Sequence, residues 1–314
     1  MNIATRAQGY KKPPVHAPLA GIACALAAFM MFAFMNMFAK LLSENHHVIE
    51  IAFYRNLIAL MPFALFVWWR GGLKTIKPVN KKGVYARAVL GIISLIVTFA
   101  AFAAMPMADV TAFLFTTSLF IPVLSILFLG EHVGLHRWTA IIIGFIGVLV
   151  MLQPSGNTNM VGVVLALSAA MMHAIMGVLL RYIGRTDAPV TVTFYFIFFG
   201  TVITLPAMPF LYVPPTITEL FYILGIGFSG AFAQLFLATA FKHVEASVVT
   251  VFNYSGIIWA TVIGYMVWGD LPGYAIVTGG TIVIGSNLYI VWRERQLRQS
   301  GQKKSATRTP PADM

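Results

Sequence analysis

The chain has 314 residues, of which 59% are hydrophobic and only 10% are charged. A soluble domain of this length carries more charge on its surface, so the composition excludes a soluble protein and indicates a protein that crosses a membrane several times. The formal net charge of +11 raises the alternative of nucleic-acid binding, which the distribution of the charges argues against. The single cysteine, Cys24, excludes an intramolecular disulfide and a cysteine-based metal cluster.

The order of apolar and polar stretches predicts an all-α membrane protein with ten transmembrane helices between two polar tails. Residues 1–17 are polar and basic, lack the features of a cleaved signal peptide and are expected to form a cytoplasmic tail. Ten apolar segments are long enough to cross a hydrocarbon layer of about 30 Å as helices. They cover approximately residues 18–42, 48–69, 84–105, 108–129, 134–152, 160–183, 189–212, 218–240, 246–268 and 273–292. Residues 293–314 are polar and basic, and we expect a disordered cytoplasmic tail there.

The positions of Lys and Arg predict the orientation of the chain. If the N-terminus is cytoplasmic, every Lys and Arg except Lys40 and Arg55 falls in a cytoplasmic tail, a cytoplasmic loop or the helix end beside one. This bias places both termini in the cytoplasm. The basic charge then attracts anionic lipid rather than nucleic acid. We expect no cofactor and no metal ion, and a monomer or a weak homodimer.

The chain also repeats itself. One constant offset pairs Met30, Met31, Met35 and Phe53 with Met171, Met172, Met176 and Phe194, and a second offset pairs Ala108 and Gly147 with Ala246 and Gly285. The halves, 18–152 and 160–292, therefore hold five segments each. Because five is odd, the second half starts on the opposite side of the membrane and is inverted. Inverted repeats are typical of transporters, whose substrate site lies near mid-membrane between the halves.

Three motifs carry a resemblance to a known family. They are "FYRN" in the second segment, "PVLSILFLGE" in the fourth and "NYSGIIWATVIGYMVWGD" in the ninth. With the two inverted halves, they make residues 18–292 similar to the EamA-type members of the drug/metabolite transporter superfamily. Two departures are Asp270, where Glu is common, and Ala260 or Thr261 at the place that matches Pro122. The resemblance implies an inner-membrane permease, often an exporter, for amino acids or other small metabolites.

Arg55 is the strongest candidate for a substrate contact. It lies about 10 Å below the outer surface, given a rise of 1.5 Å per residue. A charge at this depth is expected to face protein or water. One interpretation is a clamp for a substrate carboxylate or phosphate, because a guanidinium binds such groups in a bidentate manner. The other is a structural arginine that extends outward or pairs with Glu44, Glu50 or Asp109.

Other residues within the segments are candidates for the same site. His173 could transfer protons or could only hydrogen-bond across a helix pair. Met35 and Met176 lie on methionine-rich faces that either line a cavity or pack against neighbours. The remaining candidates for hydrogen-bonding or stacking contacts are Asn36, Gln234, Asn253, Tyr254 and Trp259. Pro122 is expected to kink the fourth segment and is a candidate hinge.

These features predict a secondary transporter or facilitator, and not an enzyme, that moves a small metabolite by alternating access. The expected cargo is an amino acid or a related carboxylate, and the expected direction is export. The alternative is an uptake permease for a nucleoside-like or cofactor-like metabolite. An intramembrane enzyme would need a polar cluster such as Glu131, His132 and His136. Gly130-Glu131 and Gly269-Asp270 fit better as matched turn markers on opposite faces of the membrane.

Overall fold

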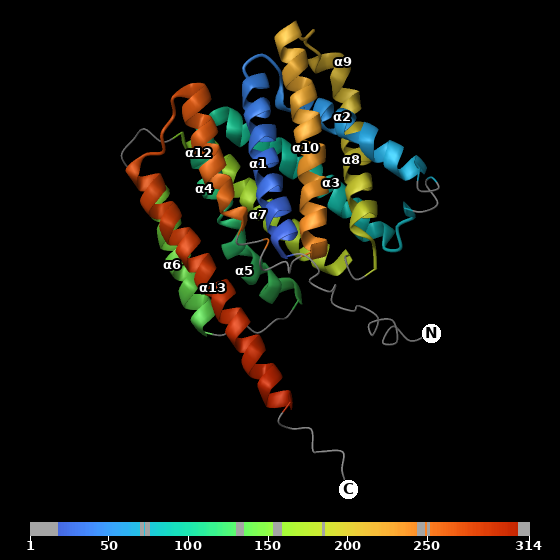
Figure 1. Ribbon diagram of the computed structural model, residues 1–314. Helices are drawn as coiled ribbons and strands as arrows, with labels where there is room; N and C mark the ends of the chain where they lie inside the picture. Colours follow the sequence, from blue (N-terminus) through green and yellow to red (C-terminus); the bar gives the residue numbers. More distant parts are fainter. Residues whose placement is uncertain are drawn as a thin grey trace.

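The computed structural model describes residues 18–69, 72, 76–129, 135–152, 159–183, 186–243, 249 and 252–306. Throughout this part of the chain the regular structure is helical (Figure 1). The helices are α1 (Pro18–Leu42), α2 (Val48–Trp69), α3 (Lys81–Ala104), α4 (Met107–Leu114), α5 (Thr117–Leu129), α6 (Leu135–Leu152), α7 (Met160–Ile183), α8 (Pro189–Thr204), the 3-10 turn η3 (Leu205–Ala207), α9 (Met208–Leu211), α10 (Ile217–His243), α12 (Ser255–Trp268) and α13 (Tyr274–Ala306).

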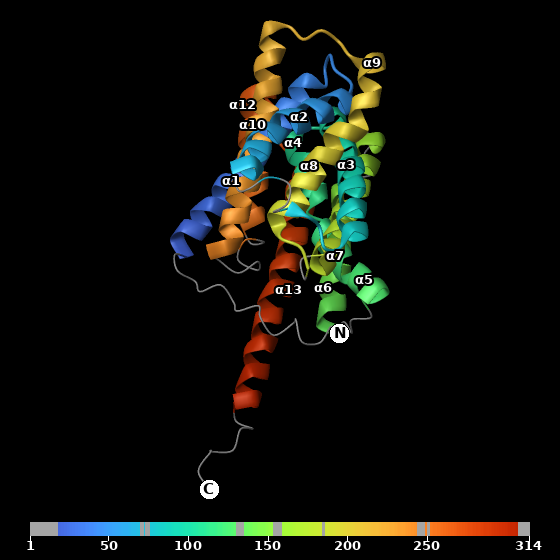
Figure 2. The same cartoon turned by 90° about the vertical axis from the view of Figure 1, so that its right-hand side faces the viewer.

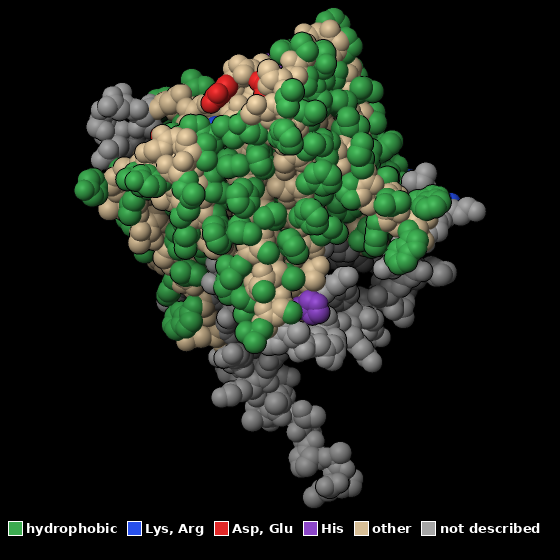
Figure 3. Space-filling view, turned by 45° about the horizontal axis from the view of Figure 1, so that its top comes forward, with side chains coloured by type: hydrophobic (Ala, Val, Ile, Leu, Met, Phe, Trp, Pro, Cys, Tyr) green, Lys and Arg blue, Asp and Glu red, His purple; other side chains and the backbone are tan. Residues whose placement is uncertain are grey.

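Six helical stretches are long and apolar enough to cross a membrane. They are Leu19–Leu42, Val48–Trp69, Lys81–Ala104, Met160–Leu180, Val190–Leu211 and Ile217–Leu237. Three shorter apolar stretches are Met107–Ile121, Trp138–Met151 and Ser255–Trp268. Hydrophobic side chains cover the flank of the bundle, and acidic side chains are visible at one end (Figure 3). The all-helical membrane fold is confirmed, whereas the count of ten crossings and the cytoplasmic termini remain predictions.

The fourth predicted segment, 108–129, is wrong as one continuous helix, because a turn at Phe115 and Thr116 separates α4 from α5. A turn at Tyr254 interrupts the ninth segment in the same way, just before α12. Hydroxyl groups beside both turns bond to the backbone. Thr116 Oγ1 donates to the Phe113 carbonyl at 2.7 Å, and Ser255 Oγ donates to the Phe252 carbonyl at 2.7 Å. Such local bonds satisfy carbonyls that the helix leaves free.

The break in the first half lies before Pro122, which is a residue of α5. The second half breaks at the matching place although Ala260 stands where Pro122 would be. The break therefore does not require the proline, and a hinge at Pro122 remains a prediction. Of the two predicted turns, the structure describes only the one at Gly269-Asp270. Gly269 ends α12 with a φ of 72°, and the Asp270 N–H bonds to the Gly264 carbonyl at 3.2 Å, whereas Gly130-Glu131 lies outside the described residues.

Packing between the helices follows the sequence repeat. The repeat relates α1 to α7, α2 to α8, and α3 to α10. The helix α1 packs against α10, just as α7 packs against α3 (Figures 1 and 2). Likewise α2 packs against α10 as α8 packs against α3, and α1 packs against α12 as α7 packs against α5. Each half thus supplies one helix to each of these contacts, and the two halves exchange roles between the contacts of each pair.

The helices α6 and α13 form a pair beside the remaining bundle (Figure 1). Their backbones approach at Gly147 and Gly279, where a Cβ on Gly147 would stand 2.7 Å from the Gly279 carbonyl oxygen. Small residues permit such close crossings in membranes. The helix α13 continues to Ala306, so the disorder predicted for residues 293–314 is wrong as far as Ala306. Its Arg, Gln, Glu and Lys residues favour helix, and extending a formed helix needs no new nucleus. Residues 1–17 and 307–314 lie outside the described residues.

Polar contacts connect the two halves at the predicted outer end. Lys40 Nζ lies 3.6 Å from Asp270 Oδ2 and donates to the Met105 carbonyl at 3.1 Å. Asn45 Nδ2 donates to Glu219 Oε1 at 2.8 Å. The buried His46 lies between two acids, with Nδ1 3.1 Å from a carboxylate oxygen of Glu50 and Nε2 3.7 Å from one of Glu219. Residues of α1, α2 and the loop between them are thereby connected to the start of α10 and the end of α12.

Candidate functional site

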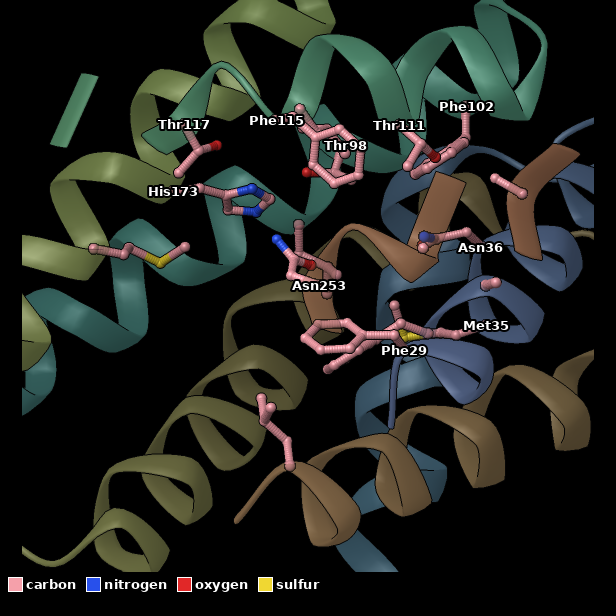
Figure 4. Close-up of a pocket in the computed structure, with 18 of the residues that line it drawn as sticks. Phe29, Met35, Asn36, Thr98, Phe102, Thr111, Phe115, Thr117, His173 and Asn253 are labelled. Atoms are coloured by element: carbon pink, nitrogen blue, oxygen red, sulfur yellow. The ribbon is translucent and has the colours of Figure 1, made fainter. Parts of the chain in front are cut away.

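A cavity of about 530 Å³ lies between the halves (Figure 4). This volume lies within the range of small-molecule sites. Eight of the nine substrate-binding residues predicted from the sequence line it: Met35, Asn36, Arg55, His173, Met176, Gln234, Asn253 and Tyr254. Figure 4 shows Asn36, His173 and Asn253 directed into the same space from different helices. The structure places these eight residues around one cavity, and their roles in binding remain predictions.

Trp259 is the predicted residue that does not line the cavity. It lies on α12, half-buried, and packs against the apolar cluster that includes Phe113 and Val283. Tyr254 lies at the break before α12 and does reach the cavity, with its ring edge-on to Phe115 at a centroid distance of 5.1 Å. The break thus brings the Tyr254 ring to the cavity while Trp259 stays in the core.

Both helix breaks face the cavity. Phe115, Thr117 and Ser118 line it from the first break, and Asn253 and Tyr254 line it from the second. Irregular backbone at membrane depth is tolerated where it lines a cavity, and interrupted helices of this kind form substrate sites in transporters. The breaks therefore make backbone and hydroxyl groups available within an otherwise apolar bundle.

Arg55 projects from α2 into this cavity with only 1% of its surface exposed. Its Nη1 donates to Asn56 Oδ1 at 2.8 Å, and Asn56 Nδ2 donates to the Ala52 carbonyl at 2.8 Å, which fixes the amide. The guanidinium carbon lies 5.3 Å from the centroid of the Phe196 ring. Its Nε is buried without an acceptor among the described residues. Arg55 neither extends into solvent nor forms an ion pair with a described acid.

Arg87 is a second, half-buried cation that the sequence analysis missed. It lies on α3, its guanidinium carbon is 4.8 Å from the same Phe196 centroid, and it lines the cavity. Within the described part of the chain, its buried Nε and Nη1 have no acceptor. Its place in a basic stretch made it look like a loop residue. Asn80 was the available signal, because its side chain caps α3 at the Gly83 N–H and so places Arg87 well inside the helix.

The position of Phe196 locates the site relative to the repeat. Phe196 is the repeat counterpart of Arg55, so a twofold rotation would exchange their positions. Two equivalent positions come into contact only near the rotation axis. If the halves are related by the twofold rotation that the repeat predicts, the contact between the Arg55 guanidinium and the Phe196 ring lies close to the rotation axis. The sequence is asymmetric at this point, with a cation in one half and an aromatic ring in the other.

The electrostatics of the cavity are one-sided. Arg55 and Arg87 contribute positive charge, and no Asp or Glu lines the cavity among the residues that the structure describes. The other polar lining is uncharged amide and hydroxyl groups together with His173. In the described ranges, no group of three or more His, Cys, Asp or Glu side chains could hold a metal ion. The cavity can thus offer two guanidinium groups, several neutral hydrogen-bonding groups and an apolar wall.

Comparisons with known proteins agree with this architecture. A model of the EamA-like transporter family matches residues 19–153 and again residues 160–292. A pseudopaline exporter of Pseudomonas aeruginosa is 28% identical over 84% of this chain and 93% of its own. An S-adenosylmethionine uptake transporter of Rickettsia prowazekii is 25% identical over 90% and 96%. A riboflavin transporter of Vibrio cholerae is 27% identical over 90% and 97%.

A solved crystal structure shares the fold, with a TM-score of 0.62 at 15% identity over 88% of this chain and 98% of the other. Together with the apolar helices, the family match shows a multi-pass protein of the inner membrane that transports small molecules and is not an enzyme.

Proposed function

Because the chain belongs to the EamA-like transporter family, we propose that it exports a small metabolite with a carboxylate group by alternating access at the cavity between its halves. The observation that carries this proposal is Arg55, a buried guanidinium in a cavity of about 530 Å³ with one nitrogen that lacks an acceptor among the described residues. A carboxylate fits a guanidinium in a bidentate geometry. Met35 and Met176 supply an adaptable apolar wall for the rest of the molecule.

The proposal includes ten membrane crossings in two inverted halves, 18–152 and 160–292, with both termini in the cytoplasm. The double match of the family model and the exchanged packing of α1 with α10 and α7 with α3 support the two related halves. The distribution of Lys and Arg supports the orientation. Asn36, Gln234 and Asn253 then provide hydrogen bonds to the substrate between the halves.

Uptake of a nucleoside-like or cofactor-like metabolite is the second candidate. The relatives named for uptake of S-adenosylmethionine and for transport of riboflavin favour it, whereas the pseudopaline exporter favours export. The aromatic lining of Phe29, Phe32 and Phe115 suits a flat ring, because aromatic groups stack favourably. The two candidates differ in the direction of net transport and in their need for a carboxylate.

Transport by the purified protein in liposomes tests the proposal. A panel of labelled amino acids, carboxylates and nucleosides is assayed with the wild-type chain, with Arg55→Ala and with Lys77→Ala, whose exposed side chain is outside the cavity lining. We expect transport that requires an acidic group on the solute, is lost in Arg55→Ala and persists in Lys77→Ala. Transport of acidic solutes that is unchanged in Arg55→Ala would contradict the carboxylate contact.

A further inference from the structure

We infer that the cavity selects a small dianion, such as a dicarboxylate or a phosphate monoester, which Arg55 and Arg87 bind together across Phe196. This inference rests on the proposed function and narrows the class of substrate from any carboxylate to a doubly charged anion. It begins from the second cation, Arg87, which the carboxylate proposal does not use.

Both guanidinium groups are held against a single aromatic ring. The Arg55 carbon is 5.3 Å and the Arg87 carbon 4.8 Å from the Phe196 centroid, so the two cations are neighbours. Glycines leave room for this arrangement. A Cβ on Gly91 would stand 2.5 Å from Arg87 Nη1 and 2.8 Å from Phe196 Cε2, and a Cβ on Gly230 would stand 3.1 Å from Arg55 Nε. The surrounding helices are therefore shaped around both cations.

Two neighbouring cations in a membrane interior are costly unless an anion compensates them. Contact with an aromatic face recovers only part of this cost, since a cation–π contact contributes about 0.5–2 kcal/mol. The remaining cost is not offset by the described residues. They form no ion pair with either arginine and no hydrogen bond with Arg55 Nε or with Arg87 Nε and Nη1. Buried guanidinium nitrogens in this state mark where an external acceptor binds. A phosphate monoester, or two carboxylates on one molecule, would supply acceptors to both arginines.

The remaining residues that line the cavity make a zwitterionic or cationic substrate unfavourable. An ammonium group is normally paired with a carboxylate when it leaves water. No acid lines the cavity among the described residues, and the acids that connect the halves are bound elsewhere, Asp270 near Lys40 and both Glu50 and Glu219 near His46. His173 adds no negative charge in either protonation state. A dianion therefore gains from both arginines, whereas an amino acid would leave its ammonium group without a counter-charge.

Four probes separate these substrate classes. Succinate, butyrate and 4-aminobutyrate share a four-carbon chain and differ in charge, and glycerol 3-phosphate places the dianion on a phosphate. Apparent dissociation constants are measured for the purified full-length protein by the shift of its melting temperature. We expect succinate, glycerol 3-phosphate or both to bind at least tenfold more tightly than butyrate and 4-aminobutyrate. Whichever binds more tightly identifies the dianion as a dicarboxylate or a phosphate ester.

Variants of Arg87 test the role of the second cation. Arg87→Gln should reduce the dianion preference about tenfold, whereas Arg87→Lys should keep part of it, because lysine retains the charge. Lys77→Gln is the control at an exposed lysine outside the cavity lining and should keep the full preference. Size-exclusion chromatography shows whether Arg87→Gln is folded. If it is not, Arg87→Lys is compared with the wild type instead. Its affinity for the dianion should fall while its affinity for butyrate stays unchanged.

Three results would overturn the inference. They are failure of both dianions to bind at 10 mM, equal binding of succinate and 4-aminobutyrate, and an unchanged dianion preference in the folded Arg87 variants. Liposome transport distinguishes this failure from failure of the proposed function. Transport of a monocarboxylate or amino acid that needs Arg55 but not Arg87 would overturn dianion selectivity and leave the carboxylate transporter intact. Absence of carboxylate transport altogether would contradict the proposed function itself.

Discussion

Phe196 lies against both arginines of the cavity. Its ring contacts the guanidinium groups of Arg55 and Arg87, and the ring itself is only 6% exposed. No described carboxylate holds either arginine, so the orientation of the cations depends on how closely the neighbouring helices approach the ring. Gly91 on α3 sets this approach, because it directly adjoins both Arg87 and Phe196. A side chain at this position would act on the cations without removing a charge.

Gly91→Ala is predicted to weaken anion binding by roughly tenfold. The new Cβ would stand 2.5 Å from Arg87 Nη1, which has to move, and the loss of one charge-assisted hydrogen bond costs about 1.5–3 kcal/mol. The measurement is the affinity for succinate or glycerol 3-phosphate. Gly285→Ala on α13 is the matched control, because nothing lies within 4 Å of its Cβ position. Equal affinities in both variants would show that the Arg87 position is unimportant for binding.

The helix that carries Arg87 begins at a contact between the two halves. Asp187, between α7 and α8, accepts hydrogen bonds from the Val79 N–H at 2.6 Å and the Asn80 N–H at 3.0 Å, just before α3. Thr186 Oγ1 donates to the same carboxylate at 2.7 Å. Burial alone would raise the pKa of Asp187, but the hydrogen bonds from Thr186, Asn80 and Val79 outweigh it and lower the pKa. The second half thus anchors the start of α3.

Asp187→Asn is predicted to lower the melting temperature at neutral pH, and the difference from wild type should shrink in acid. A carboxylate with a lowered folded-state pKa contributes stability above its unfolded value of about 3.9, and this stability is lost as the pH falls through the folded value. Melting temperatures in detergent between pH 3 and pH 7 measure the effect. A difference that stays constant over this range would show that the ionised form of Asp187 does not contribute.

At the scale of the whole molecule, the long apolar segments and the internal repeat were enough to predict the helical membrane fold. Eight of the nine residues chosen from the sequence as substrate contacts line one cavity. Both signals are strong, because a membrane requires long apolar helices and because related halves meet at their axis. Arg87 was missed because a basic residue near a helix start looks like an orientation signal. The break at Phe115 was missed because the apolar sequence continues through it without a glycine, a proline or a charged residue. A local hydrogen bond from the Thr116 hydroxyl group accompanies the turn instead.

Several polar contacts between the halves lie together at the predicted outer end of the molecule. At the predicted outer end, Lys40 meets Asp270, Asn45 meets Glu219, and His46 lies between Glu50 and Glu219. The two partners of the Asn45 contact belong to different halves, the first on the loop after α1 and the second in the first turn of α10. Alternating access by rocking of the halves would have to separate such contacts at one end during each cycle.

A covalent connection at this contact is therefore predicted to stop transport. Asn45→Cys and Glu219→Cys are combined in a Cys24→Ser background, which removes the one native cysteine, and a short thiol cross-linker joins them. The wild-type side chains already touch at 2.8 Å, so cross-linking should occur without distortion and fix this end. We expect liposome transport to fall at least tenfold and to recover when a reducible linker is cleaved. The two single-cysteine proteins, treated identically, should keep their activity. Undiminished transport by the fully cross-linked protein would mean that these ends stay together throughout the cycle, which would contradict rocking of the halves at this contact.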